Sequence, residues 1–255
     1  MTSAAASPSV IGVDVGGTGI KGAVVDVVRG ELASERIRLL TPSPATPDAV
    51  AGVVAELLDE IGVAGPAGIT LPAVVRGGIV ETASNIDHAW IGVDAVELLS
   101  KATGRSVTVV NDADAAGIAE VRFGAGRDAV GVVAMVTLGT GIGSAVFVDG
   151  LLVPNTELGH LPLHHGDAED WAAESIREHE DLSWKKYAHR LQKYLELVEK
   201  LLWPQLIIIG GGVSKKADKF LPRIDLRTRL VPAQLHNEAG IVGAAVAAPT
   251  QPTSP

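Results

Sequence analysis

The sequence contains the same short pattern twice: an apolar run, a turn rich in glycine and threonine, and a second apolar run. The first copy runs from Val10 to Val28 around Gly16-Gly17-Thr18-Gly19, and the second runs from Val130 to Val148 around Gly139-Thr140-Gly141-Ile142-Gly143. Short β-branched runs bounded by glycine are typical of strands joined by a tight turn. Two such units, separated by about half the chain, predict a duplicated, two-lobed α/β architecture with a central cleft.

The other segments complete this α/β pattern. Apolar runs predict strands at 68–71, 78–81, 107–110 and 206–209, and helical spacing predicts helices at 48–61, 93–103, 115–123, 183–203 and 237–248. Asp48 is the predicted cap of the first helix, and Gly104 ends the second. We expect a small N-terminal lobe at 10–110, on which the closing helix 237–248 packs, a larger C-terminal lobe at 111–236, and disordered tails at 1–9 and 249–255.

Composition excludes several classes of protein. The chain has no cysteine, which removes disulfides, thiolate catalysis and Cys-ligated zinc. No run approaches the roughly 18 apolar residues of a membrane helix, and the N-terminus lacks the positive segment of a signal peptide, so we expect a cytoplasmic protein that does not bind membranes. A formal net charge of −9 argues against a nucleic-acid partner, because phosphate backbones are held by Lys and Arg.

The average charge hides an asymmetry. Residues 1–175 carry 9 basic and 22 acidic side chains, whereas residues 176–230 carry 12 basic and 7 acidic ones. A local excess of positive charge in an acidic protein indicates an anionic partner for that segment.

Three glycine-rich strand ends are candidate phosphate sites. Glycine lets backbone N–H groups approach a phosphate closely, and a carboxylate such as Asp14 beside the turn is suited to a hydrated Mg²⁺. One such turn alone is more often a plain hairpin, but three in one chain favour phosphate binding. They are Asp14-Val15-Gly16-Gly17-Thr18 with Lys21, Thr137-Leu138-Gly139-Thr140-Gly141, and Gly210-Gly211-Gly212-Val213-Ser214, and none fits a Rossmann or Walker pattern.

These motifs, in this order, together with Asn111-Asp112-Ala113 and Glu157-Leu158-Gly159-His160, resemble the ROK family of sugar kinases. The resemblance spans nearly the whole chain outside the tails. It implies the actin/hexokinase-like (ribonuclease H-like) fold, and a reaction in which a phosphoryl group is transferred to the 6-hydroxyl of glucose.

The resemblance also implies roles for individual residues. Asp112 is the expected general base, which takes the proton of the attacking sugar hydroxyl. The expected sugar contacts are Asn85, Asn111, Asp112, Glu157, His160 and Glu174. The expected phosphate contacts are Asp14, Gly16, Gly17, Thr18, Lys21, Thr137, Gly139, Thr140, Gly141, Gly211 and Gly212, with Mg²⁺ held by Asp14 through water.

The chain departs from the family pattern after His160. Many members continue into a cysteine-rich zinc loop, where this chain has His164, His165 and no cysteine, so we predict no structural zinc. The missing zinc loop and the basic helix after Asp181-Leu182-Ser183-Trp184 resemble the family branch that uses polyphosphate as well as ATP. This resemblance implies glucose, and also mannose, as acceptors.

A polyphosphate donor requires a row of cations. The candidates are Lys186, Arg190, Lys193 and Lys200 on one face of the helix 183–203, followed by Lys215, Lys216 and Lys219 after the glycine triplet. An ordinary solvated helix face is the alternative interpretation of the same charges.

Three other functions stay open at this point. One is an ATP-only sugar kinase, for which the basic helix is ordinary surface. Another is a sugar-sensing regulator of the same family, although only nine residues precede the first predicted strand, too few for a helix-turn-helix. The third is an actin-like filament protein, which would not need the Asn111-Asp112 and Glu157-x-x-His160 pairs. The sequence leaves open whether the chain is a monomer or a homodimer.

Overall fold

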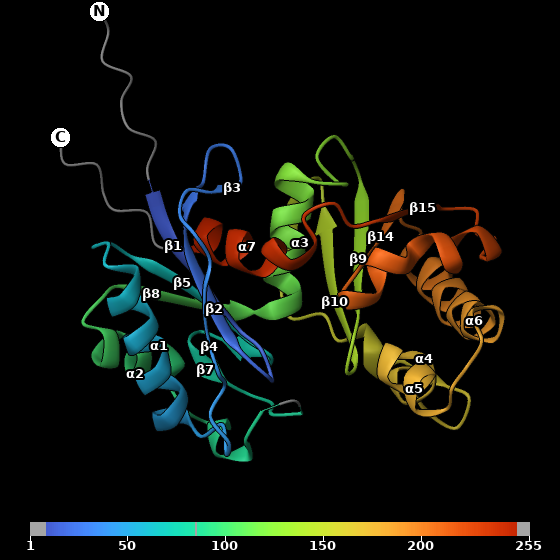
Figure 1. The fold of residues 1–255 in the computed structure, drawn as a ribbon. Helices are drawn as coiled ribbons and strands as arrows, with labels where there is room; N and C mark the ends of the chain where they lie inside the picture. The colour runs from blue at the N-terminus through green and yellow to red at the C-terminus, as the bar shows by residue number, and fades with distance from the viewer. Residues whose placement is uncertain (1–8, 85, 249–255) are drawn as a thin grey trace, which may run out of the picture. The chain divides into compact units, whose positions relative to one another are not determined.

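The computed structural model describes residues 9–84 and 86–248 (Figure 1). By its internal contacts the chain divides into two compact units, Met1–Ala119 with Glu238–Pro255, and Glu120–Asn237. The sequence predicts a boundary after residue 110, whereas this division falls after Ala119, within the helix that follows. Each unit is described by itself below.

Unit 1 is built on a sheet with the strand order β3-β2-β1-β5-β8, with β4 also paired to β2. Strands β1 and β2 form an antiparallel hairpin, whereas β1, β5 and β8 run parallel. The strands are β1 (Ser9–Val15), β2 (Ile20–Asp26), β3 (Glu31–Leu32), β4 (Ile37–Leu39), β5 (Ala67–Leu71) and β8 (Val107–Asn111), with a small hairpin of β6 (Val75–Arg76) and β7 (Ile79–Val80). The helices are α1 (Pro47–Ile61), η1 (His88–Trp90), α2 (Ala95–Thr103), α7 (Ala239–Ala247) and the start of α3 (Asp112–Phe123).

Unit 2 repeats this plan with the strand order β11-β10-β9-β14-β15. Strands β9 and β10 form the antiparallel hairpin, and β9, β14 and β15 run parallel. The strands are β9 (Val132–Leu138), β10 (Ile142–Val148), β11 (Leu151–Val153), β14 (Leu206–Gly210) and β15 (Arg229–Pro232), with the hairpin β12 (Pro162–Leu163) and β13 (Gly166–Asp167). The helices are η2 (Leu158–His160), α4 (Glu169–Ala172), α5 (Glu174–His179), α6 (Trp184–Leu202), η3 (Gly212–Lys219), η4 (Leu221–Arg223) and η5 (His236–Glu238).

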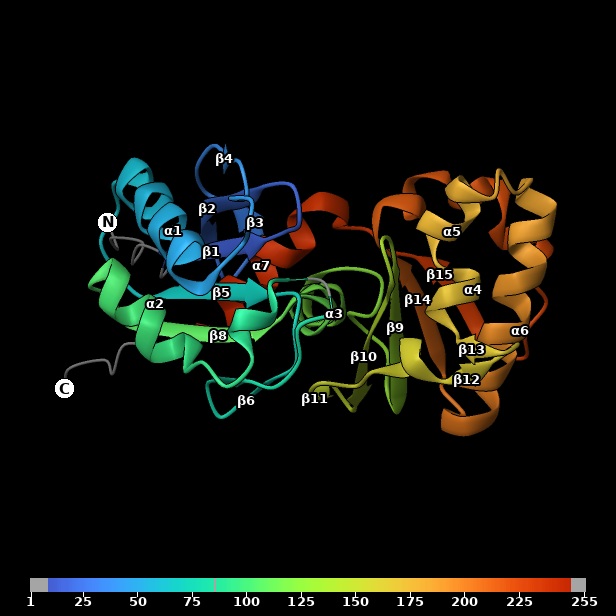
Figure 2. The same cartoon turned by 90° about the horizontal axis from the view of Figure 1, so that it is seen from below.

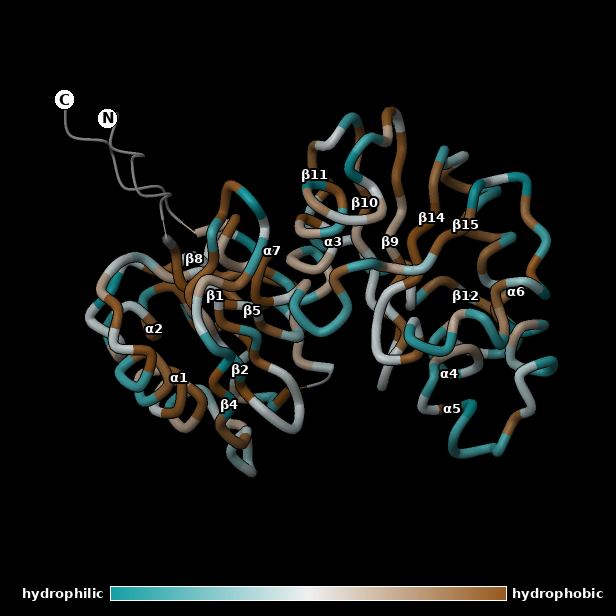
Figure 3. Tube along the Cα trace, turned by 45° about the horizontal axis from the view of Figure 1, so that its top comes forward, coloured by the Kyte–Doolittle hydropathy of each residue, from teal (hydrophilic) through white to brown (hydrophobic). Residues whose placement is uncertain are grey.

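The shared strand order confirms the duplication predicted from the two glycine-threonine turns. In each unit the central strands are almost completely buried, and Figure 3 shows hydrophobic residues concentrated along them. In unit 2 the helices α4, α5 and α6 lie on one face of the sheet (Figures 1 and 2), where α6 buries Tyr187, Leu191, Leu195 and Val198. Full burial of each such side chain stabilises the fold by about 1.5–3 kcal/mol.

The closing helix α7 packs directly on the sheet of unit 1. Its residues are all apolar or glycine and most of them are buried, which is typical of a helix enclosed by a core. It approaches β1 and β5 closely because both carry glycine where it crosses: a Cβ on Gly12 would lie 1.9 Å from the Ile241 carbonyl oxygen, and one on Gly68 would lie 1.7 Å from that of Ala244. Side chains at these two positions would displace the helix.

Three details of the sequence prediction were wrong. Ser9 is not part of the tail but the first residue of β1, where it pairs with Asp26. Asp48 does not cap α1, because the helix begins at Pro47 and its N-cap is Thr46, so Asp48 lies in the first turn. Strand β2 ends at Asp26 rather than Val28, because the Asp26 carboxylate accepts the backbone N–H of Val28 and turns the chain. The rest of the tails lies outside the described residues.

No helix within 9–84 and 86–248 is both long and apolar enough to cross a membrane.

Candidate active site

The first glycine turn of unit 1 joins β1 to β2 as predicted. The Gly16 N–H donates to the Gly19 carbonyl across the turn at 3.1 Å, and the Thr41 hydroxyl donates to the Gly16 carbonyl at 2.5 Å. Arg38 donates to the Thr18 carbonyl from the neighbouring strand β4. Gly17 and Thr18 are exposed at the tip, so their backbone N–H groups are accessible to a phosphate.

Asp14 stands at the end of β1 in a well-defined polar environment. Its Oδ2 lies 3.3 Å from the Lys21 ammonium, and its Oδ1 accepts a hydrogen bond from the buried Thr70 hydroxyl at 3.2 Å. Thr70 in turn accepts the Val15 N–H at 3.1 Å. At the start of α7, Gly240 lies so near Asp14 that a Cβ on it would be 2.9 Å from Oδ1. The N-terminus of a helix favours a carboxylate beside it.

The surroundings of Asp14 fit a hydrated magnesium ion. Mg²⁺ keeps several waters and is commonly bound by one or two carboxylates together with substrate phosphates. Asp14 is one carboxylate next to an exposed phosphate-type turn, and its side chain is 20% exposed. Within the described part of the chain no group of three or more His, Asp or Glu side chains is arranged to hold a metal by itself.

Asn111 and Asp112 lie at the junction of β8 and α3, at the sheet edge that also carries Asp14. This placement follows from the parallel register, which pairs Asp14 with Thr70 and Leu71 with Asn111. Asn111 caps α3: its Oδ1 accepts the N–H groups of Ala113 and Asp114, and its Nδ2 donates to the Ala73 carbonyl. Asp112 is the first helical residue and is only partly buried.

The other two glycine turns meet at one edge of the unit 2 sheet. Strands β9 and β14 are parallel neighbours, with Gly210 opposite Thr137, so the turn 139–141 and the triplet 210–212 follow adjacent strand ends. Gly211 has φ +78°, and a Cβ there would lie 2.1 Å from the Leu138 carbonyl oxygen. Only glycine allows this approach, which places the two predicted phosphate turns side by side.

The segment Glu157-Leu158-Gly159-His160 forms the short helix η2 against β10. Ser144 fixes it by accepting the Leu158 N–H at 2.9 Å, and Gly159 lies where a Cβ would be 2.2 Å from the Ile142 carbonyl oxygen. The predicted pair is brought together, with His160 Nε2 3.7 Å from Glu157 Oε2.

Sequence reasoning missed two carboxylates beside this pair. Asp167 Oδ2 lies 2.8 Å from His160 Nδ1, and Glu169 Oε1 lies 3.9 Å from the same atom. Glu169 also accepts the Ile142 N–H through Oε2 at 3.0 Å, which ties α4 to the turn 139–141. The available signal was the spacing of acidic residues after the motif, but the β12–β13 hairpin that folds them back is a tertiary feature.

The surrounding charges and burial shift the pKa values of His160 and Glu157. The hydrogen bond to Asp167 raises the pKa of His160, and the charges of Glu169 and Glu157 raise it further, while burial opposes them. Burial raises the pKa of Glu157, and the charge of His160 partly offsets this. The cluster is thus a set of polar groups that both donate and accept hydrogen bonds, as sugar hydroxyls require.

Glu174 lies elsewhere in unit 2. Its Oε2 is near Gly212, and its ionisation responds to Glu178, Lys216 and Arg177 rather than to Glu157 or His160; burial is the main reason that its pKa is raised. Asn85, another predicted sugar contact, lies outside the described residues. His164 and His165 form the exposed turn of the β12–β13 hairpin, where His164 stacks on Trp171 at 4.8 Å.

The basic side chains of α6 do not form one free row. Arg190 is 17% exposed, pairs with Glu180 and donates to the Trp171 carbonyl at 2.9 Å, and Lys193 pairs with Glu196. Lys186, Lys200, Lys215 and Lys216 are exposed.

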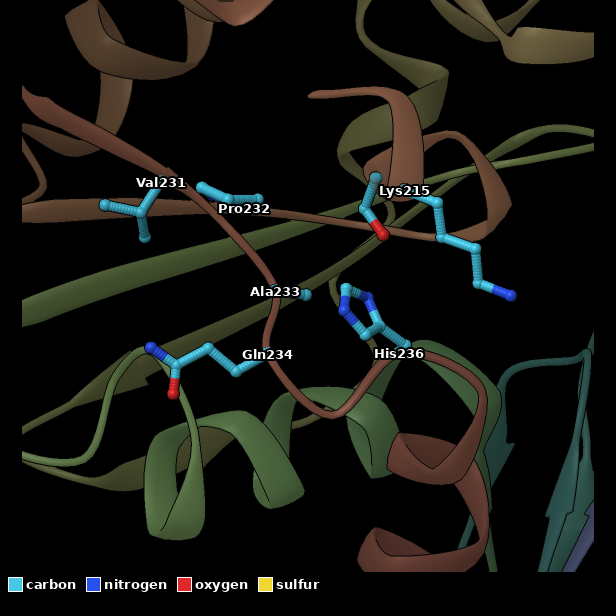
Figure 4. Close-up of a pocket in the computed structure, with 7 residues that line it drawn as sticks. Lys215, Val231, Pro232, Ala233, Gln234 and His236 are labelled. Carbon is cyan, nitrogen blue, oxygen red and sulfur yellow. The ribbon is translucent and has the colours of Figure 1, made fainter. Parts of the chain in front are cut away.

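A pocket of about 610 Å³ opens at the carboxyl ends of β14 and β15, entirely within unit 2 (Figure 4). It is lined by Ser214, Lys215, Val231, Pro232, Ala233, Gln234 and His236. Figure 4 shows the His236 ring pointing into the space between Ala233 and the segment that carries Lys215. Its size falls in the range of small-molecule sites.

Comparison with known proteins identifies the family. The model of the ROK family matches residues 10–174. The chain belongs to the ROK family. It is 51% identical over 237 residues to the polyphosphate glucokinase of Mycobacterium tuberculosis, which covers 92% of this chain and 89% of that protein.

Solved ROK structures agree in fold. The inorganic polyphosphate/ATP-glucomannokinase of Arthrobacter sp. strain KM superposes with a TM-score of 0.90 at 51% identity, covering 93% of this chain and 97% of that one. A ROK glucokinase from Streptomyces griseus, solved with glucose and AMPPNP, superposes with a TM-score of 0.81 at 24% identity, covering 93% and 98% of the two chains. The predicted actin/hexokinase-like α/β fold is thereby confirmed.

Proposed function

We propose that this ROK protein is a cytoplasmic kinase that transfers the terminal phosphoryl group of inorganic polyphosphate, and also of ATP, to the 6-hydroxyl of glucose, with mannose as a second acceptor. The observation that carries the proposal is the pairing of Gly210 with Thr137, which sets two phosphate-type turns at one sheet edge. The chain in which this occurs is 51% identical to a polyphosphate glucokinase and to a polyphosphate/ATP-glucomannokinase.

Unit 1 carries the proposed base and the proposed metal-binding carboxylate. In unit 1, Asp112 is the proposed general base: the sugar oxygen forms a bond to the terminal phosphorus, the bond to the bridging oxygen of the donor breaks, and the hydroxyl proton passes to Asp112. Asp14 would hold Mg²⁺ through water, and that ion would supply positive charge to the donor phosphates. Lys21, Gly16, Gly17 and Thr18 would contact the same phosphates.

Unit 2 supplies the remaining proposed contacts. Thr137, Gly139, Thr140 and Gly141, with Gly211 and Gly212, would bind donor phosphates through their backbone N–H groups and hydroxyls. Glu157, His160 and the neighbouring Glu169 would bind sugar hydroxyls. Asn111, in unit 1, is also a proposed sugar contact. The pocket beside Ser214 and Lys215 is large enough for the base and ribose of ATP, which supports the nucleotide as a second donor.

The first experiment measures glucose 6-phosphate formation by the purified protein with polyphosphate and with ATP, each with Mg²⁺, with EDTA, and with mannose in place of glucose. Turnover with both donors supports the proposal. Turnover with ATP but not with polyphosphate would favour the ATP-only sugar kinase. No turnover with either donor would favour the sugar-binding regulator.

The second experiment tests the proposed base. Asp112→Asn should lower kcat by about 10²–10⁴-fold with both donors, because the amide cannot accept the hydroxyl proton. Its glucose Kd, measured by calorimetry, should stay within a few fold of the unmodified protein. The exposed Asp128→Asn serves as the matched control and should retain full kcat. Retained activity in Asp112→Asn would remove Asp112 from this role.

A further inference from the structure

Trp184, the first residue of α6, is surrounded by cations. The Arg177 guanidinium carbon lies 4.5 Å from the centre of its ring, and the ammonium groups of Lys219 and Lys216 lie at 5.7 and 5.9 Å. The indole is fixed by packing, since it stacks on Phe220 at 5.9 Å and meets the edge of Tyr187. We call Arg177, Trp184, Lys216 and Lys219 the Trp184 cluster.

The positive charge of the Trp184 cluster is only partly balanced. Arg177 is 13% exposed and pairs with Glu178 at 3.0 Å, so it serves mainly to hold the indole. Lys216 and Lys219 are exposed, and neither has an ion pair with a carboxylate in the described part of the chain. The indole attracts both ammonium groups to the same place, although like charges repel. An anion at this place would bind both ammonium groups and relieve their repulsion.

The cluster also lies next to a predicted phosphate turn. Helix η3 begins directly after Gly211 and carries Lys216 and Lys219. Glu174, whose Oε2 would be 3.6 Å from a Cβ on Gly212, connects the turn to the cluster through its charge interactions with Lys216 and Arg177. The turn at Gly211-Gly212 and these two lysines therefore belong to one short segment of the chain, Gly211–Lys219.

The exposed face of α6 is a poorer candidate for the same anion. Lys186 and Lys200 are about 21 Å apart along the helix axis. Between them, Arg190 and Lys193 are neutralised by Glu180 and Glu196. The row of cations predicted from the sequence is thus interrupted, whereas the Trp184 cluster is compact.

We infer that Lys216 and Lys219, held in place by Trp184 and Arg177, bind the part of a polyphosphate chain that extends beyond the phosphates at Gly211-Gly212, and that this contact makes long chains better donors than short ones. The inference rests on the proposed function. A nucleotide or a tripolyphosphate has fewer phosphates to place at the cluster than a long chain has, so we expect the lysines to act mainly on long chains.

The test compares three double variants with the unmodified protein: Lys216→Ala/Lys219→Ala, Lys186→Ala/Lys200→Ala on α6, and Lys101→Ala/Arg229→Ala. All six side chains are exposed, so the fold is retained, and each variant loses the same charge. KM and kcat are measured for long-chain polyphosphate, tripolyphosphate and ATP at saturating glucose. The salt dependence of the long-chain KM is measured as a second readout.

The cluster variant should show an increase of about tenfold in the KM for long-chain polyphosphate, a change within twofold for tripolyphosphate and ATP, and an unchanged kcat. The slope of log KM for long-chain polyphosphate against log salt concentration should fall by about 1.4, because two phosphate contacts are lost. The Lys101→Ala/Arg229→Ala control should match the unmodified protein.

Two results would overturn the inference: a normal long-chain KM in the cluster variant, or a greater loss in the α6 variant. Failure of the unmodified protein to use any polyphosphate would instead contradict the proposed function, so the two failures are distinguishable.

Discussion

Nδ1 of His160 lies 2.8 Å from Oδ2 of Asp167, and this hydrogen bond orients the imidazole that the Glu157-Leu158-Gly159-His160 motif presents. Asp167 belongs to β13, which the short β12–β13 hairpin folds back onto η2. His160 Nδ1 is thus hydrogen-bonded to Asp167, and the other ring nitrogen, Nε2, lies 3.7 Å from Oε2 of Glu157. A carboxylate on one nitrogen fixes which hydrogen bonds the other nitrogen can make.

Asp167→Asn should lower the pKa of His160, because the largest cause that raises it is removed while burial still opposes the charged ring. NMR titration of the imidazole protons measures this midpoint, which should lie above about 6.5 in the unmodified protein. The exposed Asp170→Asn is the control. If the titration midpoint of His160 were the same in Asp167→Asn, the hydrogen bond to Asp167 would not be the cause of the raised pKa.

The same pKa has a consequence for stability. Because the folded-state pKa of His160 is raised, the stabilisation from its protonated form is present below about pH 6.5 and is lost as the pH rises through the folded-state pKa. His160 is 42% exposed, so the effect is small. The free energy of unfolding, measured in urea at pH 6 and at pH 8, should therefore differ less between the two pH values in Asp167→Asn than in the unmodified protein.

Glu169→Gln and Glu174→Gln should change the KM values of different substrates. Glu169 lies beside His160, so we expect its substitution to raise the KM for glucose by about tenfold, the loss of roughly one charge-assisted hydrogen bond. Glu174 lies beside Gly212 and Lys216, so its substitution should change the KM for the phosphoryl donor. Steady-state kinetics with each substrate varied separates the two. A raised glucose KM in Glu174→Gln alone would instead support the sugar contact that the family resemblance implies for Glu174.

Gly211→Ala should destabilise unit 2 by about 2–4 kcal/mol and reduce turnover with both donors, since a Cβ would strike the Leu138 carbonyl oxygen and φ is +78°. Gly52→Ala is a control in which the same substitution should have the opposite effect on stability. Gly52 lies within α1 with open space around it, so alanine should stabilise unit 1 by about 0.5–1 kcal/mol. Urea unfolding measures both, and equal stabilities for the two variants would contradict the steric argument.

Glu120→Gln should cost about 1–3 kcal/mol of stability. The buried Glu120 carboxylate accepts the N–H groups of Gln234 and Leu235 through Oε1 at 2.8 and 2.7 Å, and that of Ala125 through Oε2 at 2.9 Å. An amide nitrogen placed against one of these donors loses the bond and leaves buried groups unpaired. The exposed Glu35→Gln should lie within about 0.5 kcal/mol of the unmodified protein. Matching unfolding curves for both variants would refute this role.

Local chemistry made much of the fold predictable from the sequence. The β-branched runs around the two glycine-threonine turns, the helical spacing of α6 and the left-handed Gly104 that ends α2 are all short-range signals. They sufficed to predict both hairpins and the duplicated architecture, because strand pairing across a tight turn and the apolar stripe of a helix depend on neighbouring residues.

What lies together across long stretches of chain was decided only by the tertiary structure. The parallel pairing of β14 with β9 brings Gly210 to Thr137, and the β12–β13 hairpin brings Asp167 to His160. Arg190 is likewise taken out of the predicted row of cations by Glu180, ten residues before it. The sequence alone determined which residue types stand at strand ends and helix faces, because these follow from local periodicity. Sheet register and packing, which are set by the burial of the whole core, decided which of those side chains meet.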